Sequence, residues 1–136
     1  MDAVAFRNWA WGIVERNVDA GEQFGTHIFR LIAGEPAEPK PISTSELLTV
    51  LDQELSNPNT EALGCVVPVQ SWLVGDVRLN GAYFAVIGKG MTIQQRVRVT
   101  TRDPLIEPGR DLVADVMDQP VVKAINERFV AWRRSG

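Results

Sequence analysis

The sequence predicts a single α+β domain, residues 1–136, with an antiparallel or mixed sheet of about four strands and helices packed on one face. Apolar residues recur at helical spacing near both ends of the chain, whereas the middle of the chain is rich in strand-like runs. Gly88 to Gly90 separates two of these runs, which indicates an antiparallel hairpin. The expected order is helix, strand, helix, three strands and two helices. Such partial segregation is typical of the α+β class.

The first helix is predicted to begin after Asp2, whose side chain can cap it, and to end at Gly21. It carries two apolar stripes, which are Phe6, Trp9, Ala10 and Ile13 in one and Trp11, Val14 and Val18 in the other. A surface helix needs only one stripe to face a core. The second is therefore expected either to be buried as well or to stay partly exposed. Residues 24–33 follow as a strand with mixed faces.

A second helix is predicted after the proline-rich segment 34–41. Ser43 and Glu46 have the spacing of a capping box, and Ile42 and Leu47 have that of a hydrophobic staple. The apolar face of this helix, which we expect to be buried, consists of Leu47, Leu48, Leu51 and Leu55.

Three strands are predicted next, over 65–74, 78–87 and 91–102. Pro68 lies inside the first of them and cannot donate a hydrogen bond to a neighbouring strand. It therefore indicates a sheet edge or a bulge.

Two helices are predicted near the C-terminus, one beginning at Pro108 and the other at Pro120. Asp111, Asp115 and Asp118 recur at helical spacing on the first of them. Three carboxylates on one stripe could bind a hard cation. A stripe of charge is, however, more typical of the solvated side of a helix, so no metal site is predicted.

Arg96, Arg98 and Arg102 occupy alternate positions in the last predicted strand, so they share one face of it. Guanidinium groups bind anions well, which makes these residues a candidate anion-binding surface. Against this, antiparallel sheets normally leave one side wet, and no aromatic residue alternates with the arginines to stack nucleic-acid bases. We favour a solvated face.

The sequence shows no motif of a catalytic or cofactor site, and we expect no catalytic residues, no metal and no cofactor. His27 is the only histidine, and Cys65 lies among valines like a small buried hydrophobe. Neither has a local partner that would activate it. If a ligand pocket exists between sheet and helices, His27, Arg30 and Tyr83 are the candidates to supply its polar groups.

Composition limits the cellular compartment and the classes of partner that we expect for the protein. A single cysteine excludes an intramolecular disulfide, and a reducing, cytoplasmic location fits best. No apolar run approaches the ~20 residues of a membrane span, and the N-terminal segment lacks the layout of a signal peptide. The net charge of -3 argues against a general attraction to nucleic acid.

The four tryptophans are the strongest functional signal, because tryptophan and arginine are enriched where proteins meet. Trp11, Phe129 and Trp132 are the candidate interface residues. The first hypothesis is a non-catalytic module that self-associates as a homodimer through its helix faces, with a further protein partner left open. One alternative is a small-ligand-binding protein or small enzyme. Another is a component of a larger assembly, such as that of a phage.

Overall fold

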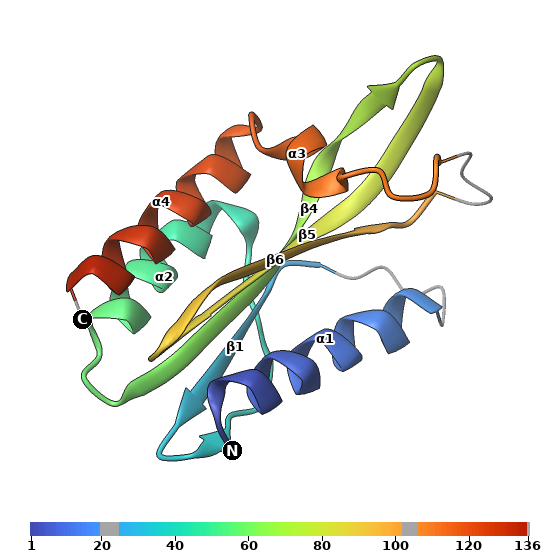
Figure 1. Ribbon diagram of the computed structural model, residues 1–136. Helices are drawn as coiled ribbons and strands as arrows, with labels where there is room; N and C mark the ends of the chain where they lie inside the picture. The colour runs from blue at the N-terminus through green and yellow to red at the C-terminus, as the bar shows by residue number, and fades with distance from the viewer. Residues whose placement is uncertain (20–24, 102–105, 136) are drawn as a thin grey trace.

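The computed structural model describes residues 1–19, 25–101 and 106–135, which form a sheet between helices (Figure 1). The strands are β1 (His27–Ile32), β2 (Glu35–Pro36), β3 (Lys40–Pro41), β4 (Thr60–Val74), β5 (Val77–Gly88) and β6 (Met91–Val99). The helices are α1 (Ala3–Asp19), the 3-10 turn η1 (Thr44–Glu46), α2 (Leu47–Ser56), α3 (Leu112–Val116) and α4 (Pro120–Ser135).

The sheet is antiparallel throughout, and its strands lie in the order β2-β1-β4-β5-β6, with β3 paired to β1 beside β2. This confirms the predicted α+β class and the antiparallel hairpin at Gly88–Gly90. The sheet has six strands rather than four, because the proline-rich segment forms the short strands β2 and β3 against β1.

Helices cover both faces of the sheet, so the prediction of helices on one face was wrong. In Figure 1, α1 lies on one side of the sheet, and α2 and α4 lie on the other. The strands carry apolar side chains on both faces, and both faces therefore have to be covered. Ile28 and Phe29, for example, are neighbours in the sequence and are both buried, in opposite clusters. Every residue of β5 from Gly81 onward is buried, which is typical of a strand covered on both faces.

The two apolar stripes of α1 are two halves of one broad face that packs on the sheet. Phe6, Ala10 and Val14 are fully buried along its centre. The residues on either side are partly buried against the same cluster, namely Ala3, Trp9, Trp11, Ile13 and Val18. Asp2 caps this helix as predicted, since its carboxylate accepts the Ala5 N–H at 2.8 Å. The predicted end at Gly21 lies outside the described residues.

The capping box before α2 does not form. Ser43 precedes the 3-10 turn η1, where its backbone carbonyl, and not its side chain, accepts the Glu46 N–H at 3.0 Å. The extra turn moves the start of α2 to Leu47. Ile42 and Leu47 nevertheless belong to the same apolar cluster, as the staple pattern predicted.

Near the C-terminus, α4 begins at Pro120 as predicted, but α3 does not begin at Pro108. Residues 108–109 form a turn in which Gly109 has φ +82°. Asp111 caps α3 instead, because its side chain accepts the Ala114 N–H at 3.1 Å.

The β4–β5 hairpin projects beyond the rest of the sheet (Figure 1). Val66 is the last residue of β4 that pairs with β1, and Gly81 is the first residue of β5 that pairs with β6. Pro68 lies just past Val66, where β4 has become an edge, so its predicted edge position is confirmed. We call the two-stranded projection, residues 70–80, the arm.

Candidate functional site

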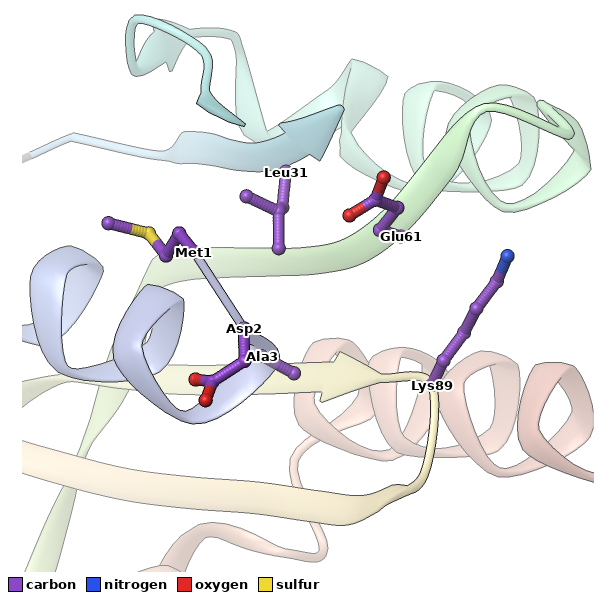
Figure 2. A pocket seen from close by; sticks show the side chains of 6 residues that line it. All are labelled: Met1, Asp2, Ala3, Leu31, Glu61 and Lys89. Carbon is purple, nitrogen blue, oxygen red and sulfur yellow. The ribbon is translucent and has the colours of Figure 1, made fainter. Parts of the chain in front are cut away.

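An open hollow of about 320 Å³ lies beside the N-terminal end of α1 (Figure 2). It is lined by Met1, Asp2, Ala3, Leu31, Glu61 and Lys89. Its two carboxylates already serve structural contacts: Asp2 caps α1, and Glu61 accepts the Gly34 N–H at 3.1 Å. A ligand pocket is normally enclosed and has a few convergent polar groups. This hollow is open and lacks such convergence, so it is a weak candidate.

The structure does not bring His27, Arg30 and Tyr83 together. The strand alternation places His27 on the α1 face with Phe29, whereas Arg30 and Tyr83 lie on the face covered by α2 and α4. His27 Nδ1 lies 2.9 Å from the Gly25 carbonyl oxygen. Arg30 forms an ion pair with Glu54 of α2 at 3.4 Å. These three residues therefore do not line a common pocket. Ligand binding by any one of them separately stays a prediction.

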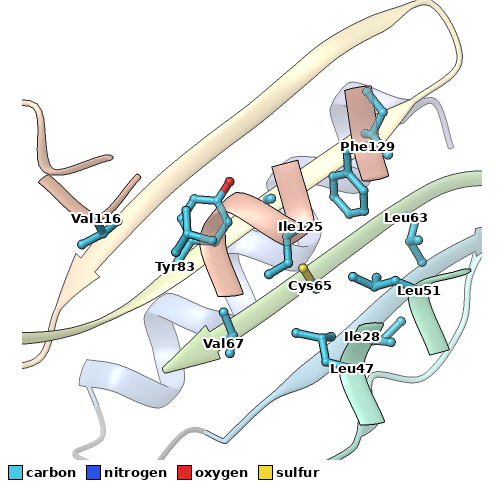
Figure 3. Packing of buried hydrophobic residues seen from close by; sticks show 13 residues of the cluster. Ile28, Leu47, Leu51, Leu63, Cys65, Val67, Tyr83, Val116, Ile125 and Phe129 are labelled. Atoms are coloured by element: carbon cyan, nitrogen blue, oxygen red, sulfur yellow. The ribbon is translucent and has the colours of Figure 1, made fainter. Parts of the chain in front are cut away.

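A polar group under α4 joins two strands to that helix. Gln95 of β6 accepts hydrogen bonds through its Oε1 from the Tyr83 hydroxyl and from Asn126 of α4. Tyr83 is fully buried (Figure 3), and burial raises the pKa of its phenol. The phenol is therefore a neutral donor. The group tightens the packing of α4 on β5 and β6.

Cys65 lies in the same cluster (Figure 3). Burial raises the pKa of its thiol to about 12, against a lowering by a backbone hydrogen bond from Ala85. At neutral pH the thiol is protonated and inaccessible, which suits packing and not nucleophilic chemistry.

The three aspartates around α3 differ in their contacts. Asp111 caps α3, and Asp118 is exposed. Asp115 accepts two hydrogen bonds at 2.8 Å from Arg110 and one at 3.3 Å from the Trp72 indole. Within the described ranges, no cluster of three histidine, cysteine, aspartate or glutamate residues could hold a metal ion.

The arginine row is partly solvated, since Arg96 is exposed and Arg98 is half-buried, but it also contacts α1. The guanidinium of Arg96 lies over the Trp11 ring, and Arg98 forms ion pairs with Glu15 at 3.0 Å and Asp19 at 2.6 Å. Arg102 lies outside the described residues. The contacts of the arginine row with α1 could not be predicted from the sequence, because Arg98 and its partner Asp19 are 79 residues apart in the chain.

The candidate interface residues are at least partly used by the chain itself. Phe129 is 0% exposed in the core beneath α4 (Figure 3), so it is a core residue and its assignment to an interface was wrong. Trp11 is half-buried, with its ring centroid 5.0 Å from that of Phe84. Trp132 is half-buried against the same cluster as Phe129.

The outer edge of β6 is a feature that the sequence analysis missed. β6 pairs with β5, and no other strand pairs with it in the part of the chain that the structure describes. The Thr100 N–H donates to the Asn80 carbonyl at 2.8 Å, so the hydrogen-bonded groups of this end of β6 alternate starting from Thr100. By antiparallel alternation, the N–H and C=O groups of Ile93, Gln95 and Val97 then point away from β5. The sequence signal was available, since no strand-like run follows residue 102.

The arm is a second surface feature, and α3 and the following turn hold its base. The Gln119 side chain accepts the Gln70 N–H and donates to the Gln70 carbonyl, both at 2.8 Å, as a neighbouring strand would. Towards the tip, Leu73 is 58% exposed and lies opposite Arg78. An exposed leucine on a supported hairpin is available for contact with another molecule.

Comparison with protein families, curated proteins and solved structures found no match. Among the described helices, none combines the length and apolar character needed to cross a membrane.

Proposed function

We propose that this protein is a non-catalytic interaction module that self-associates as a homodimer. The observation that carries the proposal is the free edge of β6, a strand of nine residues that pairs on one side only among the described strands. Unpaired N–H and C=O groups on a strand edge are a template for pairing with another chain. A cytoplasmic location is part of the proposal and rests on the single cysteine, which is buried.

The two edges of the sheet differ in a way that supports this function. At the other edge, β2 and β3 cover β1, and each has only two residues. Short edge strands are one of the ways in which proteins limit edge-to-edge pairing. β6 is longer than an average strand of ~5–6 residues, so the longer surface for pairing lies at this edge.

The proposed route differs from the helix faces that the sequence favoured. Phe129 is buried and unavailable, which removes one expected anchor. Trp11 lies over β5 and beneath Arg96 of β6, so it is close to the free edge. Trp11 and Trp132 remain candidate contributors to the interface.

Sedimentation equilibrium of the parent protein over the micromolar range tests self-association. We expect a mass approaching twice the 15.1 kDa of one chain. Truncation of a true anchor typically costs about 2 kcal/mol or more of binding. Trp11→Ala and Trp132→Ala would then shift the dimer to higher concentration. A parent that remains monomeric throughout this range would exclude the proposal.

A second candidate is a component of a larger assembly, and the arm with its exposed Leu73 favours it. An assembly of many copies needs a second contact surface besides the one that forms a dimer. Masses above the dimer that disappear in Leu73→Asp, while the dimer remains, would support this candidate. A dimer that never grows with concentration would count against an assembly built from this chain alone.

A further inference from the structure

We propose that two copies pair through β6 in antiparallel orientation, with the two-fold axis at Gln95, so that their sheets become continuous. The inference rests on the self-association proposed above and specifies its surface and register. The occupant of the free edge is thus a second copy of this chain.

The backbone supports a centre at Gln95. β6 runs from Met91 to Val99, so Gln95 is its middle residue, and a two-fold axis there overlaps the whole strand with its copy. The outward-pointing groups of Gln95 then meet those of Gln95 of the partner subunit. Those of Ile93 meet those of Val97 of the partner subunit, which forms hydrogen-bonded pairs of the antiparallel kind.

Side chains on the α1 face also fit this register. Arg96 lies opposite Gln94 of the partner subunit, whose amide oxygen can accept a hydrogen bond from a guanidinium. Arg98 lies opposite Thr92 of the partner subunit. No arginine directly faces another, which matters because like charges directly opposite one another destabilise a strand pair.

Neighbouring registers are less favourable. A two-fold axis at Arg96 sets Arg96 against Arg96 of the partner subunit, and an axis at Val97 sets Arg96 against Arg98 of the partner subunit. An axis at Gln94 sets the apolar Ile93 against Gln95 of the partner subunit. The axis at Gln95 alone among these four pairs Ile93 with Val97 and separates the arginines.

The opposite face of β6 supplies apolar contact in the same register. Ile93 and Val97 are both partly buried against the cluster under α4 and α2. Pairing Ile93 with Val97 of the partner subunit covers more of both side chains and extends the core across the axis. Aliphatic cross-strand pairs of this kind stabilise sheets.

Val97→Pro tests the edge while preserving the bonds to β5. The Val97 N–H points away from β5, so proline removes a donor that the folded monomer does not use. We expect a folded monomer by circular dichroism and sedimentation. Val97→Thr, which keeps the N–H and nearly the same shape, is the matched control and should remain a dimer.

Gln95→Cys provides a second test that survives a folding failure of the proline variant. Residues in a hydrogen-bonded antiparallel pair have Cα atoms ~5.5 Å apart, which lies within the range for a disulfide. Oxidation should cross-link most of the Gln95→Cys protein, as seen on a non-reducing gel. Gln94→Cys, which lies opposite Arg96 of the partner subunit and not its own copy, should cross-link at least ten times more slowly. Cys65 is buried and should not react in either variant.

The outcomes separate this inference from the proposed function. A dimeric parent with monomeric, folded Val97→Pro and cross-linked Gln95→Cys supports both. A dimeric parent whose folded Val97→Pro stays dimeric, or whose Gln95→Cys reacts no faster than Gln94→Cys, overturns the β6 register and leaves self-association standing. A monomeric parent overturns both.

Discussion

The guanidinium carbon of Arg96 lies 5.1 Å from the centroid of the Trp11 ring, which joins the last strand of the sheet to the first helix. Two further contacts extend this junction. Arg98 forms ion pairs with Glu15 and Asp19, and Arg7 donates to the Gln94 side chain at 3.2 Å. The α1-facing side of β6 is thus a row of polar and cation–π contacts that hold α1 against the edge of the sheet.

Substitution of Arg98 should weaken the attachment of α1. Arg98 is 35% exposed and has two carboxylate partners, so Arg98→Gln should lower the free energy of unfolding by about 1 kcal/mol. Arg78→Gln is the control, because Arg78 is exposed on the arm and bonds only to Ser71 among the described contacts. It should change stability by less than about 0.5 kcal/mol. Denaturant unfolding measures both, and equal effects would contradict this role of Arg98.

The same contacts bear on anion binding, which stays a prediction for this arginine row. Because Arg96 and Arg98 already interact with α1, we expect the double variant Arg96→Gln/Arg98→Gln to leave retention on a heparin column unchanged. Strong retention of the parent that falls with salt and disappears in the double variant would instead indicate an anionic partner.

Leu51 and Ser43 should differ sharply in their importance for stability. Leu51 is fully buried where α2 packs on the sheet, so Leu51→Ala should cost about 2–5 kcal/mol. Ser43 makes no side-chain capping bond, so Ser43→Ala should cost less than about 0.5 kcal/mol. Denaturant melts of the two variants provide the comparison, and the reverse order would show that α2 is misplaced.

The order of the long elements could be predicted from the sequence because each has its own periodicity and clear end signals, whereas the short strands β2 and β3 were not predicted. Asp2, Pro120 and the Gly88–Gly90 turn act locally, and the structure has each of them in the predicted role. The placement of α1 on the opposite face could not be predicted, since it depends on which side of the sheet a helix returns to. The consecutive apolar residues Ile28 and Phe29, which the structure buries in opposite clusters, were the available indication of a sheet covered on two sides.

The candidate site was harder to predict because it depends on long-range pairing. The partners of Arg98 lie in α1, and the free edge of β6 becomes visible only when the strand order is known. Phe129 and Trp132 belong to the same apolar face of α4, yet Phe129 is fully buried and Trp132 is partly exposed. Periodicity identifies the apolar face of a helix but not how far that face is covered.

Asp115 should make the attachment of the arm depend on pH. Hydrogen bonds from Arg110 lower the pKa of this carboxyl below its ordinary value, burial acts in the opposite direction, and the Trp72 indole lowers it further. Trp72 belongs to the arm and Asp115 to α3, so the ionised carboxylate holds the two together.

The sign of the effect follows from the lowered pKa. The stabilisation is fully present above the pKa of an unfolded aspartate, about 3.9, and is lost as the pH falls through the lower pKa of the folded state. Asp115→Asn removes the titrating group. It should therefore be less stable than the parent at pH 7, and the difference should shrink below about pH 4. Denaturant unfolding of both proteins between acid and neutral pH measures this difference, and Asp118→Asn, at an exposed neighbouring position, controls for the change in net charge. A difference between parent and Asp115→Asn that stays constant down to the acid limit of folding would show that Asp115 does not stabilise the folded protein through its charge.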